Sequence, residues 1–261
     1  MKYGFIGCGN MGGAIAKALS KTTQDIMISD PSITAKEFAA QIGCQYAENA
    51  TVASQCDRIF LAVKPQMMAG VLSAIADILA DRKPVLISIA AGIEIQQIQK
   101  MVGTSLPVIR LMPNTPVAVE KGMIVYCKND LVAKELLDDF LFDMRYCGRL
   151  DPLEEKLIDA ASALSGSGPA YLYMFLEAMA DGAVACGLPR KKAMEYAAAT
   201  MEGAAQMYLQ SGEHPGELKD AVCSPAGSTI VGVQQLENHG FRSAVMDCVI
   251  AAYHKNKELG K

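Results

Sequence analysis

The segment Gly7-Cys8-Gly9-Asn10-Met11-Gly12 arranges three glycines as GxGxxG directly after a short apolar run, Tyr3–Ile6. In this context the first glycine makes a tight turn, the second lets the backbone approach a pyrophosphate, and the third lets a helix pack on a strand. The N–H groups that are free at the start of the following helix favour an anion. The segment therefore predicts a dinucleotide-binding turn, and a simple glycine turn is the alternative.

Asp30 stands about 20 residues after Gly9, at the end of a second apolar run, Ile26–Ser29. An acidic side chain at that position binds the ribose 2′-hydroxyl of NAD and repels the 2′-phosphate of NADP. No arginine follows within the next several residues, but Ser32 could donate to a phosphate, so the cofactor preference stays open. The alternative is that Asp30 caps a turn before Pro31.

Two further loops follow predicted strands: Ala62-Val63-Lys64-Pro65-Gln66 and Ala90-Ala91-Gly92. Ligands of open α/β sheets bind beyond the carboxyl ends of the strands, so we expect these loops to face the ribose and nicotinamide. Lys64 either binds a hydroxyl or acts as an acid, or it is a plain surface lysine. The loop Met112–Pro116 fits a pocket and a structural turn equally well.

A second anion site is predicted in Cys223-Ser224-Pro225-Ala226-Gly227-Ser228-Thr229, where an apolar helical pattern restarts. We expect Ser224 to cap this helix and Pro225 to fill its first turn. Gly227 then leaves the N–H groups of residues 227–229 open, which suits a carboxylate. From these residues alone, an ordinary capped helix is the favoured alternative.

These residues need a scaffold, and in the first half of the chain short apolar runs alternate with helical patterns. Such alternation predicts βαβ units and a parallel sheet that is covered on both faces. The predicted strands are Tyr3–Ile6, Ile26–Ser29, Arg58–Ala62, Pro84–Ile89 and Pro107–Leu111, with two more near Met123–Cys127 and Arg145–Leu150.

After Leu153 only helices are predicted, and Gly187–Leu188–Pro189 ends one of them and starts the next. The segment Gly168–Cys186 is apolar nearly all round, with only Glu177 and Asp181 charged. A helix of that kind must be buried on most sides. Because this half is short, we expect a partner subunit to cover it, and therefore an obligate dimer.

The chain has 261 residues, 51% of them hydrophobic, which is enough for two domains, predicted at 1–152 and 153–261. Its net charge of −4, without any basic run, argues against nucleic-acid and membrane-surface partners. Eight cysteines without a CxxC pair indicate reduced thiols in a cytoplasmic protein, with no metal site. No apolar run reaches the roughly 18 residues of a membrane span, so a soluble protein is expected.

Six segments together resemble pyrroline-5-carboxylate reductase, over residue 3 to about residue 240: GFIGCGNM, LAVKPQ, ISIAAG, MPNTP, LSGSGPAYLYMFLEAMADGAVACGLPR and HPGELKDAVCSPAGSTIVGVQQLE. The resemblance implies an α/β N-terminal Rossmann domain and a C-terminal all-helical dimerisation domain. It also implies dimers that often assemble into a ring-like decamer. The implied reaction is the reduction of L-1-pyrroline-5-carboxylate to L-proline by NADPH or NADH, the last step of proline biosynthesis.

The resemblance also implies site residues, at the positions of this sequence that match the motifs of the family. The implied cofactor positions are Ile6, Gly7, Cys8, Gly9, Asn10, Met11, Asn49, Ala62, Val63, Lys64, Pro65 and Ala90. The dinucleotide-binding pattern adds Gly12 and Asp30 to them. The implied substrate positions are Glu155, Ser224, Gly227, Ser228 and Thr229. The Thr229 hydroxyl would hydrogen-bond the ring nitrogen and help to relay its proton, which makes Thr229 the predicted catalytic residue. Asp30 departs from the family, where many members have serine.

Two other functions remain as alternatives. A β-hydroxyacid dehydrogenase or imine reductase of similar build would need a catalytic lysine early in its second domain. Between residue 153 and Lys191 only Lys156 is present, and the pattern GxxGxxxKxxxN is absent. A dinucleotide sensor without chemistry would not need an intact SPAGST segment. The three histidines, His214, His239 and His254, fit surface or capping roles better than the role of a base.

Overall fold

The computed structural model describes residues 1–259, and these form two compact units. The first comprises Met1–Ser167 together with the chain from Ala252 onward, and the second comprises Gly168–Ala251. The first unit therefore runs past residue 152, the predicted end of the Rossmann domain. The physical reason is that Arg110, in the sheet, pairs with Glu155 and Asp159 on the segment that follows.

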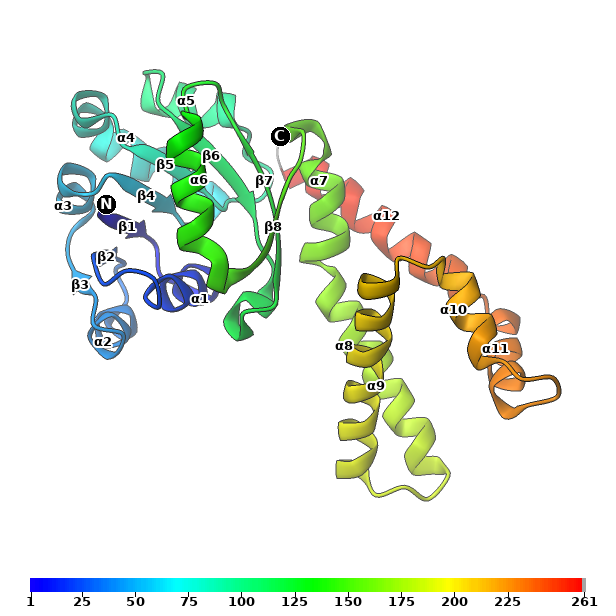
Figure 1. Cartoon of the computed structure of the whole chain (residues 1–261). Coiled ribbons are helices and arrows are strands. Elements are labelled where there is room, and N and C mark those ends of the chain that lie inside the picture. Colours follow the sequence, from blue (N-terminus) through cyan, green and yellow to red (C-terminus); the bar gives the residue numbers. More distant parts are fainter. Residues whose placement is uncertain (260–261) are drawn as a thin grey trace. The chain divides into compact units, whose positions relative to one another are not determined.

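The first unit contains one sheet of eight strands in the order β3-β2-β1-β4-β5-β6-β7-β8 (Figure 1). All neighbouring pairs are parallel except β6 and β7, which are antiparallel. The first six strands have the order of a dinucleotide-binding sheet, in which the strand order switches between β1 and β4. The strands are β1 Tyr3–Ile6, β2 Ile26–Ser29, β3 Gln45–Tyr46, β4 Arg58–Leu61, β5 Val85–Ser88, β6 Val108–Met112, β7 Gly122–Lys128 and β8 Gly148–Pro152.

The register aligns the carboxyl ends of the central strands. Ile6 of β1 lies opposite Ser29 of β2 and Leu61 of β4. Leu61 in turn lies opposite Ser88 of β5. The loops that follow these four strands therefore start side by side at one edge of the sheet.

Both faces of the sheet are covered, because successive side chains on a strand point to opposite faces and both sets are apolar. Phe5 and Phe60 stack on one face with ring centroids 4.4 Å apart, in a core that also contains residues of α1 and α6. Ile6 and Leu61 lie in the second core, with residues of α3, α4 and α5. The helices of this unit are α1 Asn10–Leu19, α2 Ile33–Gln41, α3 Asn49–Gln55, α4 Pro65–Arg82, α5 Ile95–Val102, α6 Lys134–Asp143 and α7 Ile158–Ala161, with the short η1 Thr115–Val119, η2 Met144–Cys147, η3 Glu155–Leu157 and the π-helical η4 Ser162–Gly166.

A buried polar cluster fastens α6 to the amino ends of β1 and β4. The Arg58 guanidinium is 1% exposed and donates to Asp143 (3.1 Å), to the Leu136 carbonyl (3.2 Å) and to the Tyr3 hydroxyl. The Tyr3 hydroxyl donates to Asp143 at 2.6 Å. Burial is the main cause that raises the pKa of Tyr3 far above that of an ordinary tyrosine. The hydroxyl therefore keeps its proton and stays a donor.

The second unit is helical. Its helices are α8 Gly168–Ala185, α9 Arg190–Ser211, α10 Pro215–Val222, α11 Ser228–Asn238 and the first part of α12 Phe241–Leu259. The turn between α8 and α9 confirms the predicted break at Gly187, whose φ is +97°. Several large apolar side chains of this unit are exposed, among them Met174 (71%) and Tyr173 (63%) on α8. Among residues 1–259, no helix combines the length and the hydropathy that crossing a bilayer requires.

Candidate functional site

The glycine turn lies at the aligned strand ends, and two of its glycines are required by packing inside the unit. Gly7 follows β1 with φ +98°, and a Cβ placed there would lie 2.5 Å from the Ala62 carbonyl oxygen. A Cβ on Gly12 would lie 2.8 Å from the Gly7 oxygen and 2.9 Å from Ala62 Cβ. Both contacts are too close for any other residue, so β1, α1 and the loop after β4 meet only because these positions are glycine.

Gly9 differs from its neighbours, because an added Cβ would meet no heavy atom within 4 Å. It is the N-cap residue of α1, and no side chain caps this helix. The N–H groups at the start of α1 therefore face open space. That arrangement fits a pyrophosphate, which needs both the donors and a close backbone approach.

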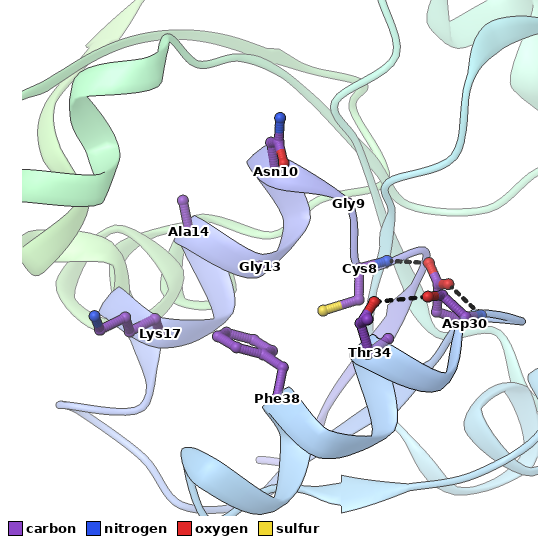
Figure 2. A pocket seen from close by; sticks show the side chains of 11 residues that line it. Cys8, Gly9, Asn10, Gly13, Ala14, Lys17, Asp30, Thr34 and Phe38 are labelled. Atoms are coloured by element: carbon purple, nitrogen blue, oxygen red, sulfur yellow. Dashed lines mark hydrogen bonds between the residues drawn. The ribbon is translucent and has the colours of Figure 1, made fainter.

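A cleft of about 490 Å³ lies beside this turn, between residues of α1 and α2 (Figure 2). The Asp30 carboxylate forms part of its wall and accepts the Cys8 N–H at 2.7 Å. The residues that line the cleft are Cys8, Gly9, Asn10, Gly13, Ala14, Lys17, Asp30, Ser32, Thr34, Ala35 and Phe38.

The Cys8 thiol belongs to the same wall. Its pKa is raised to about 11, first by burial and then by the nearby Asp30 carboxylate. A thiol with that pKa remains protonated at neutral pH and is a poor nucleophile. Cys8 therefore contributes shape and a backbone donor to the cleft.

The remaining predicted cofactor positions also follow strand ends. Ser29, at the end of β2, donates to the Asn49 side chain at 2.7 Å and so connects β2 to the start of α3. Lys64 is exposed at the N-cap of α4, with Pro65 in the first turn. Ala90, just after β5, is 3% exposed. The structure thus brings the predicted cofactor positions, from Ile6 to Ala90, to one edge of the sheet.

The loop after β6 has a structural role. Asn114 is 8% exposed, and its side chain accepts the Met123 N–H (2.9 Å) and donates to the Ser165 carbonyl (3.0 Å). Of the two interpretations of the segment Met112–Pro116, these contacts support the structural turn. They also attach the loop to η4.

Glu155, an implied substrate position, makes contacts that the sequence did not reveal. Its Oε1 accepts the Ile95 N–H at the start of α5 (2.8 Å) and pairs with Arg110 (3.3 Å). Arg110 is 1% exposed, and its second partner is Asp159 at 3.2 Å. The sequence does contain one signal of these ion pairs, because Arg110 is a charge inside the apolar run PVIRL and a buried arginine needs acidic partners.

The helix start in the second unit differs from its prediction in detail. Ser224 was expected to cap α11 and Pro225 to fill its first turn, but the N-cap is Gly227 and the helix begins at Ser228. Pro225 and Ala226 are instead the central residues of a turn in which the Ser224 carbonyl accepts the Gly227 N–H at 3.0 Å. Ala226 has φ +57°, which makes this turn incompatible with a helix.

Gly227 leaves the start of α11 open. No side chain caps the helix, and a Cβ at Gly227 would lie 2.4 Å from Ser224 Oγ. The Gly227 N–H is not open as expected, because it is bonded to the Ser224 carbonyl. The first turn of α11, with Ser228 and Thr229, keeps unused N–H donors that suit a carboxylate. Ser224, Gly227, Ser228 and Thr229 are together in the second unit, while Glu155 lies in the first.

No group of three or more His, Cys, Asp or Glu residues suited to a metal ion occurs in the described part of the chain. His214 caps α10, where its Nδ1 accepts the Gly216 N–H at 3.1 Å, as the sequence suggested.

Comparison with known proteins agrees with both halves of this arrangement. The family described as "Pyrroline-5-carboxylate reductase dimerisation" matches residues 155–259, and "NADP oxidoreductase coenzyme F420-dependent" matches residues 2–92. The pyrroline-5-carboxylate reductase of Escherichia coli K12 is 44% identical over all of this chain and 98% of its own length. That of Methanosarcina acetivorans is 41% identical over the same shares.

A solved structure is similar throughout. The crystal structure of Plasmodium falciparum pyrroline carboxylate reductase with NADP bound superposes with a TM-score of 0.91 at 34% identity, covering 100% of this chain and 98% of that one. The sheet order, the open glycine turn and the SPAGST helix start thus occur in a chain that belongs to the pyrroline-5-carboxylate reductase family.

Proposed function

We propose that this chain reduces L-1-pyrroline-5-carboxylate to L-proline with NADPH or NADH, as the last step of proline biosynthesis. The observation that carries the proposal is the uncapped start of α11, where Gly227 leaves N–H donors free beside the Thr229 hydroxyl. Full-length relatives that are named for this reaction support the same substrate.

In this proposal the first unit binds the dinucleotide, which supplies a hydride when bound. The α1 N-terminus would hold the pyrophosphate, and Asp30 the adenosine ribose. The nicotinamide half would lie against the loops after β4 and β5. The residues involved would be Ile6, Gly7, Cys8, Gly9, Asn10, Met11, Gly12, Asp30, Asn49, Ala62, Val63, Lys64, Pro65 and Ala90.

The second unit binds the substrate. The Ser228 and Thr229 N–H groups would hold the carboxylate of the imine, with Ser224 and Gly227 beside them. The Thr229 hydroxyl would hydrogen-bond the ring nitrogen and help to relay the proton that this nitrogen gains. Glu155, the fifth implied substrate position, lies in the first unit, where both of its hydrogen bonds use Oε1. Most of the rate enhancement would come from holding the imine and the hydride donor in a productive geometry.

The apolar surface of the second unit supports a proposal for how the protein assembles. We infer a homodimer through these helices, because side chains such as Met174 and Tyr173 are exposed in the single chain and the dimerisation family matches this region. Dimers would assemble further into a decamer. Eight free cysteines fit a reducing compartment, so we place the enzyme in the cytoplasm.

The direct test mixes the protein with pyrroline-5-carboxylate and either cofactor and follows the loss of NAD(P)H absorbance. We expect turnover with at least one cofactor. A folded oligomer that turns over neither would contradict the proposed reaction.

Thr229→Ala tests the assignment of the proton relay. We expect kcat to fall by about 10²-fold, the usual contribution of a positioned proton donor, while the Kd for the dinucleotide is unchanged. Thr104→Ala is the matched control, because it makes the same change in the first unit, at a half-buried position between α5 and β6. A raised dinucleotide Kd in Thr229→Ala would instead place Thr229 in the cofactor site.

A further inference from the structure

Asp30 is fixed in place by two backbone donors. Its Oδ2 accepts the Cys8 N–H at 2.7 Å and its Oδ1 accepts the Ser32 N–H at 2.8 Å. The carboxylate therefore bridges the glycine turn and the loop before α2 (Figure 2). Moving it out of the cleft would break both bonds, and the partly buried Cys8 N–H would lose its acceptor.

This bridge uses donors that a phosphate would need. The Ser32 N–H is already bonded to Asp30, and the Ser32 and Thr34 hydroxyls bond each other at 2.7 Å, which uses one of their two O–H donors. Among the residues that line the cleft, Lys17 is the only lysine or arginine. In Figure 2 Lys17 lies at the other end of the cleft from Asp30 and points away from it.

The same geometry suits a ribose diol. An ionised carboxylate has about four lone-pair sites, and two of those on Asp30 remain after the backbone bonds. A diol supplies two O–H donors for them. A 2′-phosphate supplies only acceptors and negative charge, next to a carboxylate that is held where it is.

We propose that this chain binds NADH in preference to NADPH and that Asp30 is the residue that sets the preference. The proposal rests on the proposed function only in requiring that the first unit binds a nicotinamide dinucleotide. It concerns the adenosine end of the cofactor and is independent of the imine substrate.

The test measures the Kd of NADH and of NADPH by isothermal titration calorimetry in the wild-type protein and in Asp30→Ser. We expect the wild type to bind NADH at least about tenfold more tightly, and the variant to lower that ratio about tenfold or more. Most of the change should come from tighter NADPH binding. Higher salt should reduce the wild-type discrimination, since it screens the repulsion.

Two further variants complete the design. Asp30→Asn removes the charge but keeps the size of the side chain, and it should also lower the ratio. Glu37→Gln removes a charge from an exposed position of α2 outside the cleft lining, and it should leave the ratio unchanged. Wild-type protein that binds the two dinucleotides equally, or NADPH more tightly, would overturn the proposal. So would an unchanged ratio in folded Asp30→Ser.

The outcomes also separate this inference from the proposed reaction. Preferential NADH binding without turnover of pyrroline-5-carboxylate would support the role of Asp30 and contradict the proposed reaction. Turnover of pyrroline-5-carboxylate by a protein with equal affinities for NADH and NADPH would support the proposed reaction and contradict the role of Asp30. If neither dinucleotide bound, both proposals would fail.

Discussion

At the scale of single residues, the three glycines of the turn have different reasons to be glycine. Gly7 and Gly12 leave room for protein atoms, whereas the space next to Gly9 contains no protein atom. The sequence pattern GxGxxG does not distinguish them, and only the fold shows which glycines serve packing and which serves ligand access. The difference can be measured, because a substitution at Gly12 should change stability, whereas a substitution at Gly9 should change dinucleotide affinity.

We expect Gly9→Ala to leave the free energy of unfolding within about 0.5 kcal/mol of wild type, since φ is −71° and the added Cβ meets nothing. Its dinucleotide affinity should fall at least about tenfold, because the methyl group occupies the approach of the pyrophosphate. Gly12→Ala is the matched variant and should lose about 1–3 kcal/mol of stability through overpacking. Denaturant melts and calorimetric titrations measure both effects; the reverse pattern would exclude Gly9 from the binding site.

At the scale of elements, Asn114 connects the loop after β6 to η4, which carries the chain toward α8. Its two hydrogen bonds, to the Met123 N–H and the Ser165 carbonyl, are shielded from water. Asn129 makes an analogous pair of bonds, to the Val108 N–H and the Leu106 carbonyl, and neither partner belongs to η4. The two asparagines therefore form a matched pair.

Replacing either asparagine by alanine should cost about 2 kcal/mol, because each change leaves a partly buried N–H and carbonyl without partners. Only Asn114→Ala should speed hydrogen exchange of the backbone amides in η4, which hydrogen–deuterium exchange with mass spectrometry resolves. Equal exchange of η4 in both variants would mean that Asn114 does not stabilise that segment.

How far the sequence predicts this structure depends on whether a feature is local. Six strands, β1, β2 and β4 to β7, follow from apolar runs. The strand expected from Arg145 begins only at Gly148, because the residues before it form η2. β3 was missed because Gln45 and Tyr46 are exposed and too few to form a pattern. The start of α11 was misplaced because it depends on the positive φ of Ala226, which no propensity indicates. The acidic partners of Arg110 come from residues 45 and 49 positions away, so spacing along the chain could not reveal them.

At the scale of the whole molecule, the second unit has little core of its own. Its buried apolar residues are Ala180, Ala193 and Ala197, while larger side chains on α8, α9 and α12 are exposed. Stability of this unit should therefore depend on association, and dilution should lower its melting temperature.

Met174→Glu should weaken the dimer at least about tenfold, because a carboxylate would replace an exposed thioether on α8 and would be buried without a partner in the interface. Met67→Glu makes the same change on α4 of the first unit and should leave association unchanged. Sedimentation velocity over a concentration series measures both constants. A dimer that tolerates Met174→Glu would require the interface to lie elsewhere.

The last turns of α12, from Ala252 onward within the described residues, belong to the first unit. The Asn256 side chain donates to the Asp159 carbonyl at 3.2 Å, and Lys257 pairs with the Asp159 carboxylate at 3.5 Å. During translation, the ribosome therefore releases the last pieces of the dinucleotide-binding unit only after the whole helical unit has been synthesised. A premature stop codon near residue 252 would cut α12, which both units share, and remove these contacts from the unit that was begun first.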